Sequence, residues 1–199
     1  HLHLLRKGAP GQALHLVKDM LHNPGSVFYV RQQQPAGLGH AVWCARHLVG
    51  SEPVAVLLAD DLILGASCVK EMVDAYKAGN MVAVMDVQHE QTGSYGIVTP
   101  GADDGRIVQV EGLVEKPNPS SAPSNIAVVG RYIITPEVFE TLAAQERGAG
   151  GEIQLTDALA KQIGRAPFSG VRFSGERFDC GSKLGFLPVS YTHLTLPTS

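Results

Sequence analysis

The stretch Val54-Ala55-Val56-Leu57-Leu58-Ala59-Asp60-Asp61 is an apolar run that ends in two adjacent carboxylates. A run rich in Val and Leu that follows a proline predicts a strand buried on both faces. In open α/β sheets, ligands bind beyond the carboxyl ends of the strands, where a carboxylate can serve Mg²⁺ and substrate phosphates. The alternative is that Asp60 and Asp61 only end the strand and begin a turn, and this stretch alone does not decide between the two.

Strand and helix patterns alternate around this stretch. The predicted order is a helix over residues 12–21, then a strand over 26–30, a helix over 38–48, the strand over 53–59, a helix over 65–78 and a strand over 81–87. Alternation of this kind predicts a parallel α/β sheet with right-handed connections.

The pattern changes in the second half of the chain. Short strands are expected over residues 95–99, 106–110 and 113–116, a longer strand over 125–135, and helices over 136–142 and about 155–163. An α/β half is thus followed by a mixed half. We expect one domain with two lobes, over about residues 1–90 and 91–187.

Composition excludes several classes of protein. The chain has 199 residues, 44% of them hydrophobic, and a net charge of −3, so no nucleic-acid or anionic-membrane surface is expected. No apolar run approaches the roughly 18 residues of a membrane span. The three cysteines are widely spaced, which indicates a reducing compartment and no disulfide framework.

Both ends of the chain look unlike those of a natural domain. His1 directly precedes a helical pattern, with no strand before it. Residues 188–199 have no helical period and no relation to what precedes them. We therefore expect a gene fragment whose tail comes from unrelated sequence, and that tail is excluded from the functional argument.

Three further segments could carry chemistry. Residues 31–41 contain Gln32 and Gly37 between a strand and a helix, where free N–H groups and an amide could meet an anion or a pyrimidine edge. Glu115 and Lys116 end a strand before Pro117, and Asp179 supplies another carboxylate near Gly181. An ordinary turn, a solvated charge pair and a lone acidic residue are the alternatives, and they are commoner in general.

Taken in order, these segments resemble bacterial UTP–glucose-1-phosphate uridylyltransferases over roughly residues 10–187. The resemblance rests on seven stretches besides the one quoted first, at residues 31–32, 37–42, 95–98, 113–117, 123–132, 148–157 and 178–181. Each stretch is weak evidence alone, but the ordered set is highly specific.

The resemblance implies an α/β, Rossmann-like nucleotide-diphospho-sugar transferase fold, with a mixed, mainly parallel sheet and helices on both faces. It also implies the Mg²⁺-dependent reaction of UTP with glucose 1-phosphate to give UDP-glucose and pyrophosphate, in a cytoplasmic homo-oligomer. By position, Gln32 and Gly37 would bind the uracil. Asp60 and Asp179 would bind the metal, and Asp61 would lie beside them on the nucleotide side.

The sugar side follows from the same resemblance. Gly96, Glu115 and Gly130 would line the glucose site, with Glu115 accepting sugar hydroxyls, and Lys116 would hold the sugar phosphate. Lys116, Asp60 and Asp179 are therefore the expected catalytic residues. No protein nucleophile is needed, because the protein has to align two polyanions and neutralise the growing charge.

The sequence departs from the family at both ends. The family's last helical region, which is used in subunit contacts, is replaced by the tail at residues 188–199. The Gly-rich loop after the family's first strand, which binds the triphosphate, is absent. We therefore expect residues 1–187 to be a domain truncated at its N-terminus, and the chain to be inactive alone. The alternatives are a thymidylyl-type sugar-1-phosphate nucleotidyltransferase, a metal-dependent glycosyltransferase and a non-catalytic nucleotide-binding module.

Overall fold

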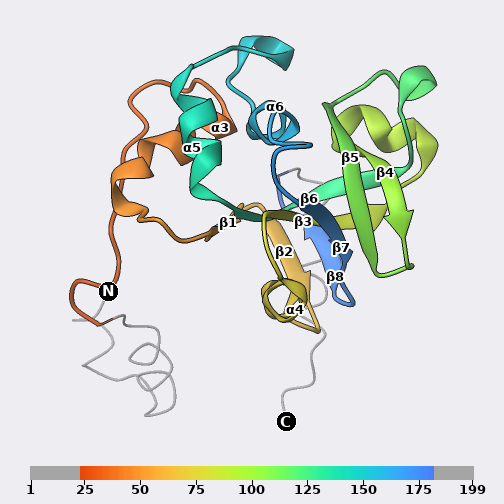
Figure 1. Ribbon diagram of the computed structural model, residues 1–199, viewed down its shortest axis with the longest axis horizontal. Coiled ribbons are helices and arrows are strands. Elements are labelled where there is room, and N and C mark those ends of the chain that lie inside the picture. Colours follow the sequence, from red (N-terminus) through yellow and green to blue (C-terminus); the bar gives the residue numbers. More distant parts are fainter. Residues whose placement is uncertain (1–22, 182–199) are drawn as a thin grey trace, which may run out of the picture. The chain divides into compact units, whose positions relative to one another are not determined.

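The computed structural model describes residues 23–181 (Figure 1). The chain divides into two units, residues 1–31 and 32–199, and the elements below belong to the second. The helix predicted over residues 12–21 and the tail at 188–199 lie outside the described residues. The division into lobes at about residue 90 stays a prediction.

A six-stranded sheet forms the centre of the second unit. Its strand order is β1-β6-β3-β7-β5-β4. These strands are β1 (Val54–Leu57), β3 (Asn80–Asp86), β4 (Gly96–Asp103), β5 (Ile107–Glu115), β6 (Ile126–Ile134) and β7 (Phe168–Arg172). A separate two-stranded sheet joins β2 (Asp61–Leu64) to β8 (Glu176–Asp179).

The expectation of a mainly parallel sheet is wrong for the described strands. Among the strand pairs of residues 23–181, only β3 and β7 are parallel. The reason is the position of β6, which runs between β1 and β3 in the opposite direction. β1 and β3 keep the common direction that their strand–helix–strand order predicts, but they are not neighbours.

Helices cover both faces of the sheet, as expected. α3 (Leu38–Cys44), α5 (Pro136–Ala143) and α6 (Leu155–Ala160) pack in one apolar cluster with Val82 and Val84 of β3. The alternate residues of β3, Met81 and Ala83, face the second cluster, which includes α4 (Cys68–Ala75). Figure 1 shows α3 and α5 close together and α4 beside the small sheet. This period of two is what places helices on opposite sides of one sheet.

β1 is less buried than its sequence predicts. It alternates between half-buried and exposed positions, and Leu57 is 53% exposed. β1 lies at the end of the strand order and pairs only with β6 among the described strands. An apolar run therefore need not mean burial on both faces when the strand has one neighbour.

Other element boundaries also differ from the sequence expectation. Residues 27–30 form no strand, and Tyr29 is 96% exposed. The two short strands expected at 106–110 and 113–116 are one strand, β5. The helix expected over 65–78 is the shorter α4, which begins after Ser67, whose hydroxyl accepts the N–H of Lys70. Boundaries depend on such caps and pairings more than on hydrophobic period.

Four short 3₁₀ helices occupy connections within residues 23–181. They are Arg46–Leu48 after α3, His89–Ser94 before β4, Pro119–Ser121 before β6, and Ala149–Gly151 before α6. The first of them continues the helix predicted over residues 38–48, which α3 therefore covers only in part.

Candidate active site

A pocket of about 300 Å³ lies where the large and small sheets meet. Its walls contain seven residues singled out from the sequence, namely Asp60, Asp61, Gly96, Glu115, Lys116, Gly130 and Asp179. These residues come from segments up to 119 positions apart (179 − 60). The fold therefore brings the predicted metal-side and sugar-side residues into one place.

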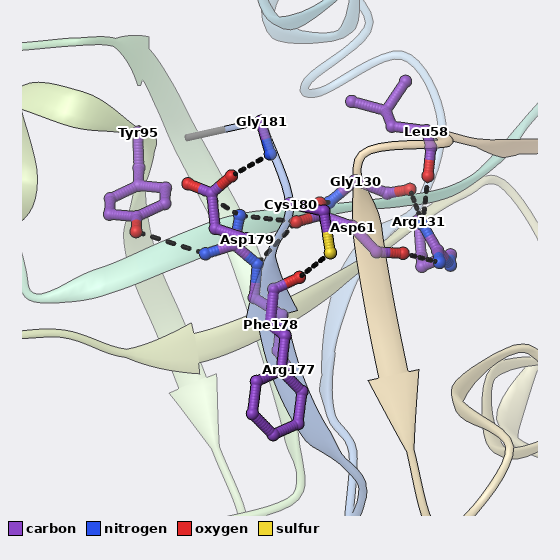
Figure 2. Close-up of polar contacts among 10 residues, drawn as sticks. All are labelled: Leu58, Asp61, Tyr95, Gly130, Arg131, Arg177, Phe178, Asp179, Cys180 and Gly181. Carbon is purple, nitrogen blue, oxygen red and sulfur yellow. Dashed lines mark hydrogen bonds and ion pairs between the residues drawn. The ribbon is translucent and has the colours of Figure 1, made fainter. Parts of the chain in front are cut away.

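The carboxylates of Asp60 and Asp179 converge at one edge of this pocket. A Cβ placed on Gly181 would lie 3.3 Å from Asp60 Oδ2 and 3.1 Å from Asp179 Oδ1. The backbone holds the two segments together, because the N–H of Cys180 donates to the carbonyl of Asp60 at 2.7 Å. Figure 2 shows Asp179 beside Gly181, whose N–H donates to Oδ1 of Asp179. Both carboxylates thus flank the position that a side chain at residue 181 would occupy.

Asp61 has a different environment from its neighbour Asp60. Its side chain is 6% exposed, and Oδ2 accepts the backbone N–H of Gly130 at 2.7 Å. Oδ1 pairs with the guanidinium of Arg177 at 2.5 Å, and Arg131 donates to the carbonyl oxygen of Asp61 (Figure 2). Both carboxylate oxygens are therefore used inside the protein, which favours a supporting role for Asp61 over direct contact with a nucleotide.

Glu115 faces the other side of the pocket. Its side chain is 12% exposed, and Oε2 accepts a hydrogen bond from the Thr156 hydroxyl at 2.8 Å. A Cβ on Gly96 would come within 3.2 Å of that oxygen and 3.0 Å of the Thr156 methyl group. Glycine at position 96 therefore leaves open the space in front of Glu115.

Gly130 is required for a similar reason. A Cβ at this position would lie 2.4 Å from Asp61 Oδ2 and 2.8 Å from the Cβ of Leu58. No side chain fits there without displacing the Asp61 carboxylate. The absence of a side chain at residue 130 keeps both the Asp61 contact and the pocket wall intact.

Lys116 has an unusual backbone conformation. Its φ angle is +45°, in the left-handed region that L-residues rarely adopt. Its N–H donates to the carbonyl of Tyr95 at 2.9 Å, and its Nζ lies 3.8 Å from Glu115 Oε1. Strain of this kind is often found at functional positions. The exposed Lys116 ammonium group lies beside the half-buried carboxylate of Glu115.

We expect Lys116→Gly to fold more stably than Lys116→Ala, by about 1 kcal/mol. Alanine keeps the left-handed strain, whereas glycine relieves it at a smaller entropic cost. A difference of this size shifts the melting temperature by about 2–4 °C in a chain of this length. Gln145, which has a φ angle of +53° and lies outside the pocket, is the matched control. Its Gly variant should likewise be more stable than its Ala variant by about 1 kcal/mol. Equal melting temperatures for the two Lys116 variants would contradict the strain.

Gln32 and Gly37 lie together but are not part of the pocket wall. The Gln32 amide donates to the carbonyl of Gly37 at 3.0 Å and lies 2.9 Å from His40 Nδ1. Gly37 has a φ of +106°, and a Cβ there would come within 2.7 Å of the Ile153 carbonyl oxygen. The loop is thus fixed against Ile153 at the start of α3, next to Leu38, which does line the pocket.

The pocket is acidic. Burial raises the pKa of the Tyr132 phenol above its ordinary value, and the charges of Glu115, Asp61 and Asp60 raise it further. Tyr132 therefore stays protonated at neutral pH. A pocket in which several carboxylates gather attracts cations and needs positive charge before it can accept a phosphate.

Among the residues of this site that were not singled out from the sequence are Tyr95, Thr156 and Arg177. Arg177 precedes Asp179 by two positions, so the period of a strand places both on one face of β8. Thr156 lies within the 148–157 stretch that supported the family resemblance. Tyr95 likewise begins the 95–98 stretch that supported the resemblance.

Within the described residues 23–181, no helix combines the length and apolar character needed to cross a membrane.

Comparison with known proteins places the chain in a family. Residues 12–192 match the nucleotidyl transferase family. The UTP–glucose-1-phosphate uridylyltransferase of Komagataeibacter xylinus is 52% identical over 164 residues, which are 81% of this chain and 58% of that protein. The Bacillus subtilis enzyme of the same name is 46% identical over 171 residues, covering 84% and 59%.

A solved structure agrees. The crystal structure of a UDP-glucose pyrophosphorylase complexed with UDP-glucose superposes with a TM-score of 0.81 at 41% identity, covering 84% of this chain and 65% of that one. The chain therefore spans somewhat under three fifths of the length of these two curated relatives. The predicted α/β nucleotide-diphospho-sugar transferase fold and the resemblance to uridylyltransferases are confirmed, and the chain belongs to the nucleotidyl transferase family.

Proposed function

We propose that this protein is a uridylyltransferase that makes UDP-glucose and pyrophosphate from UTP and glucose 1-phosphate. The observation that carries the proposal is the meeting of Asp60 and Asp179 with Glu115 and Lys116 in one pocket. The first pair suits a cation and its phosphates, and the second suits a sugar phosphate. The names of the related proteins supply the base and the sugar.

Glucose 1-phosphate would be bound by Gly96, Glu115, Lys116 and Gly130. The Thr156 hydroxyl donates a hydrogen bond to Glu115 Oε2. This bond fixes the carboxylate in an orientation from which it can accept sugar hydroxyls. The Lys116 ammonium would hold the phosphate of glucose 1-phosphate. An oxygen of that phosphate attacks the α-phosphorus of UTP, the bond to the β-phosphate oxygen breaks, and pyrophosphate leaves.

The residues present fit a divalent cation, which we propose to be Mg²⁺. No group of three or more His, Cys, Asp or Glu side chains in the described part of the chain could hold a metal alone. Mg²⁺ usually binds through one or two carboxylates together with substrate phosphates and water, and Asp60 and Asp179 supply such a pair. When bound, the cation would neutralise charge on the phosphate oxygens.

The uracil is assigned to Gln32 and the backbone of Gly37. The hydrogen bond between them supports the proposal, because it orients the amide at the start of α3. A thymidylyl-type enzyme would use the same sugar side with a different base contact. A glycosyltransferase would start from the finished sugar nucleotide and would release no pyrophosphate. Cytoplasmic location, a homo-oligomeric parent protein and inactivity of this chain alone stay predictions.

Calorimetry tests the proposed specificity on the 199-residue chain. We expect UDP-glucose to bind in the presence of Mg²⁺, and dTDP-glucose and ADP-glucose to bind at least tenfold more weakly. Lys161→Ala, which removes an exposed lysine outside the pocket, should leave UDP-glucose affinity unchanged. Equal affinity for UDP-glucose and dTDP-glucose would refute the uridylyl assignment.

A further inference from the structure

Arg177 makes contacts that reach three parts of the site. Its side chain is 13% exposed, and its guanidinium lies 2.5 Å from Asp61 Oδ1 and 3.9 Å from Asp179 Oδ2. It also donates to the Tyr95 hydroxyl at 3.2 Å and stacks near the Tyr95 ring, 5.4 Å from the centroid. Figure 2 shows the guanidinium between these groups. A planar group with five donors can make such contacts at the same time.

These contacts add to those of Gly130 and Arg131 with Asp61 in joining the large sheet to the small sheet. Asp179 is the last residue of β8 in the small sheet, whereas Lys116 directly follows β5 of the large sheet. Tyr95 provides the connection, because its hydroxyl meets Arg177 while its carbonyl accepts the N–H of Lys116. The distance between Asp179 and Lys116 is therefore linked to the position of one guanidinium.

The charge of Arg177 is already balanced by Asp61. The Asp61 carboxylate is much closer than Asp179, and the attraction between charges falls with distance. Arg177 can thus attract the Asp179 carboxylate without a hydrogen bond to it, which leaves Asp179 Oδ2 available to a cation. Arg131 differs in kind, since its donors reach the carbonyl oxygens of Leu58, Gly130 and Asp61.

We infer that Arg177 is a positioning residue for the proposed reaction, setting the metal-side carboxylate Asp179 against the phosphate-side ammonium Lys116 through Asp61 and Tyr95. The inference rests on the proposed function. Arg177 itself touches neither substrate nor cation in this account. Its loss should weaken the contribution of the cation to nucleotide-sugar binding more than it weakens binding itself.

The test compares UDP-glucose dissociation constants in Mg²⁺ and in EDTA for the 199-residue chain. The dissociation constant in EDTA divided by that in Mg²⁺ measures the contribution of the cation. The main variant is Asp61→Asn with Arg177→Met, which removes both charges but keeps an acceptor for Gly130. Tyr95→Phe breaks only the hydroxyl contact. Arg172→Met is the matched control, because Arg172 also pairs with carboxylates, Asp86 and Asp103, but does not line the pocket.

We expect the ratio to fall about tenfold in the double variant, as for other residues that orient metal ligands. It should fall about threefold in Tyr95→Phe, as expected for one lost hydrogen bond, and stay constant in Arg172→Met. An unchanged ratio in a folded double variant would overturn the inference, and so would an equal loss of affinity in Mg²⁺ and in EDTA. Absence of UDP-glucose binding by the unsubstituted chain would instead overturn the proposed function, and the inference with it.

Discussion

Lys116→Ala is expected to lower the rate of pyrophosphate release by about 10²–10³-fold. The assay uses a chimaera in which the matched residues of this chain replace the corresponding 164 residues of the Komagataeibacter xylinus relative. Lys116 is an exposed cation beside the half-buried Glu115, in a backbone conformation that costs free energy to hold. Removal of one preorganised group that stabilises transition-state charge has an effect of this size.

The control for this prediction is Lys161→Ala in the same chimaera. Lys161 pairs with Glu146 outside the pocket, so its removal should leave the rate within about twofold. The Lys116→Ala chimaera should keep the melting temperature of the parent chimaera or exceed it. A folded Lys116→Ala chimaera with full activity would exclude Lys116 from the phosphate site.

Arg177→Met is expected to destabilise the chain by about 3–5 kcal/mol. The substitution leaves the Asp61 carboxylate, 6% exposed, without its counter-charge in the interior. An unpaired buried charge costs this much, whereas removal of both charges can be nearly neutral. The double variant Asp61→Asn with Arg177→Met should therefore recover most of the loss, because asparagine still accepts the Gly130 N–H.

Urea denaturation of the single and double variants measures this coupling. Lys70→Met is the control, because Lys70 forms an ion pair with Asp74 that is exposed and worth about 0.5 kcal/mol or less. Additive effects of the two substitutions would mean that Asp61 and Arg177 act independently. That result would remove the structural basis for treating Asp61 as a supporting residue.

Local sequence pattern was enough to predict the residues at strand ends. Asp60, Glu115 and Lys116 each follow or end an apolar strand, and the strands bring them to one pocket with Asp179. The family that the order of the motifs predicted is confirmed by the comparisons. These features depend on short segments whose period and ends are visible in the chain itself.

The features that the sequence did not reveal depend on distant pairing. The direction of β6 between β1 and β3 made the sheet less parallel than expected and left β1 with one described neighbour. The ion pair between Asp61 and Arg177 joins residues 116 positions apart. No local period encodes such a contact, so adjacent Asp60 and Asp61 looked equivalent although one is exposed and the other buried.

Pyrophosphate release from UTP and glucose 1-phosphate in the presence of Mg²⁺ is the decisive test of the uridylyltransferase assignment. We expect the chimaera to release one pyrophosphate for each UDP-glucose formed, with UTP preferred over dTTP and no activity in EDTA. A folded chimaera that binds UDP-glucose but releases no pyrophosphate would contradict the uridylyltransferase assignment.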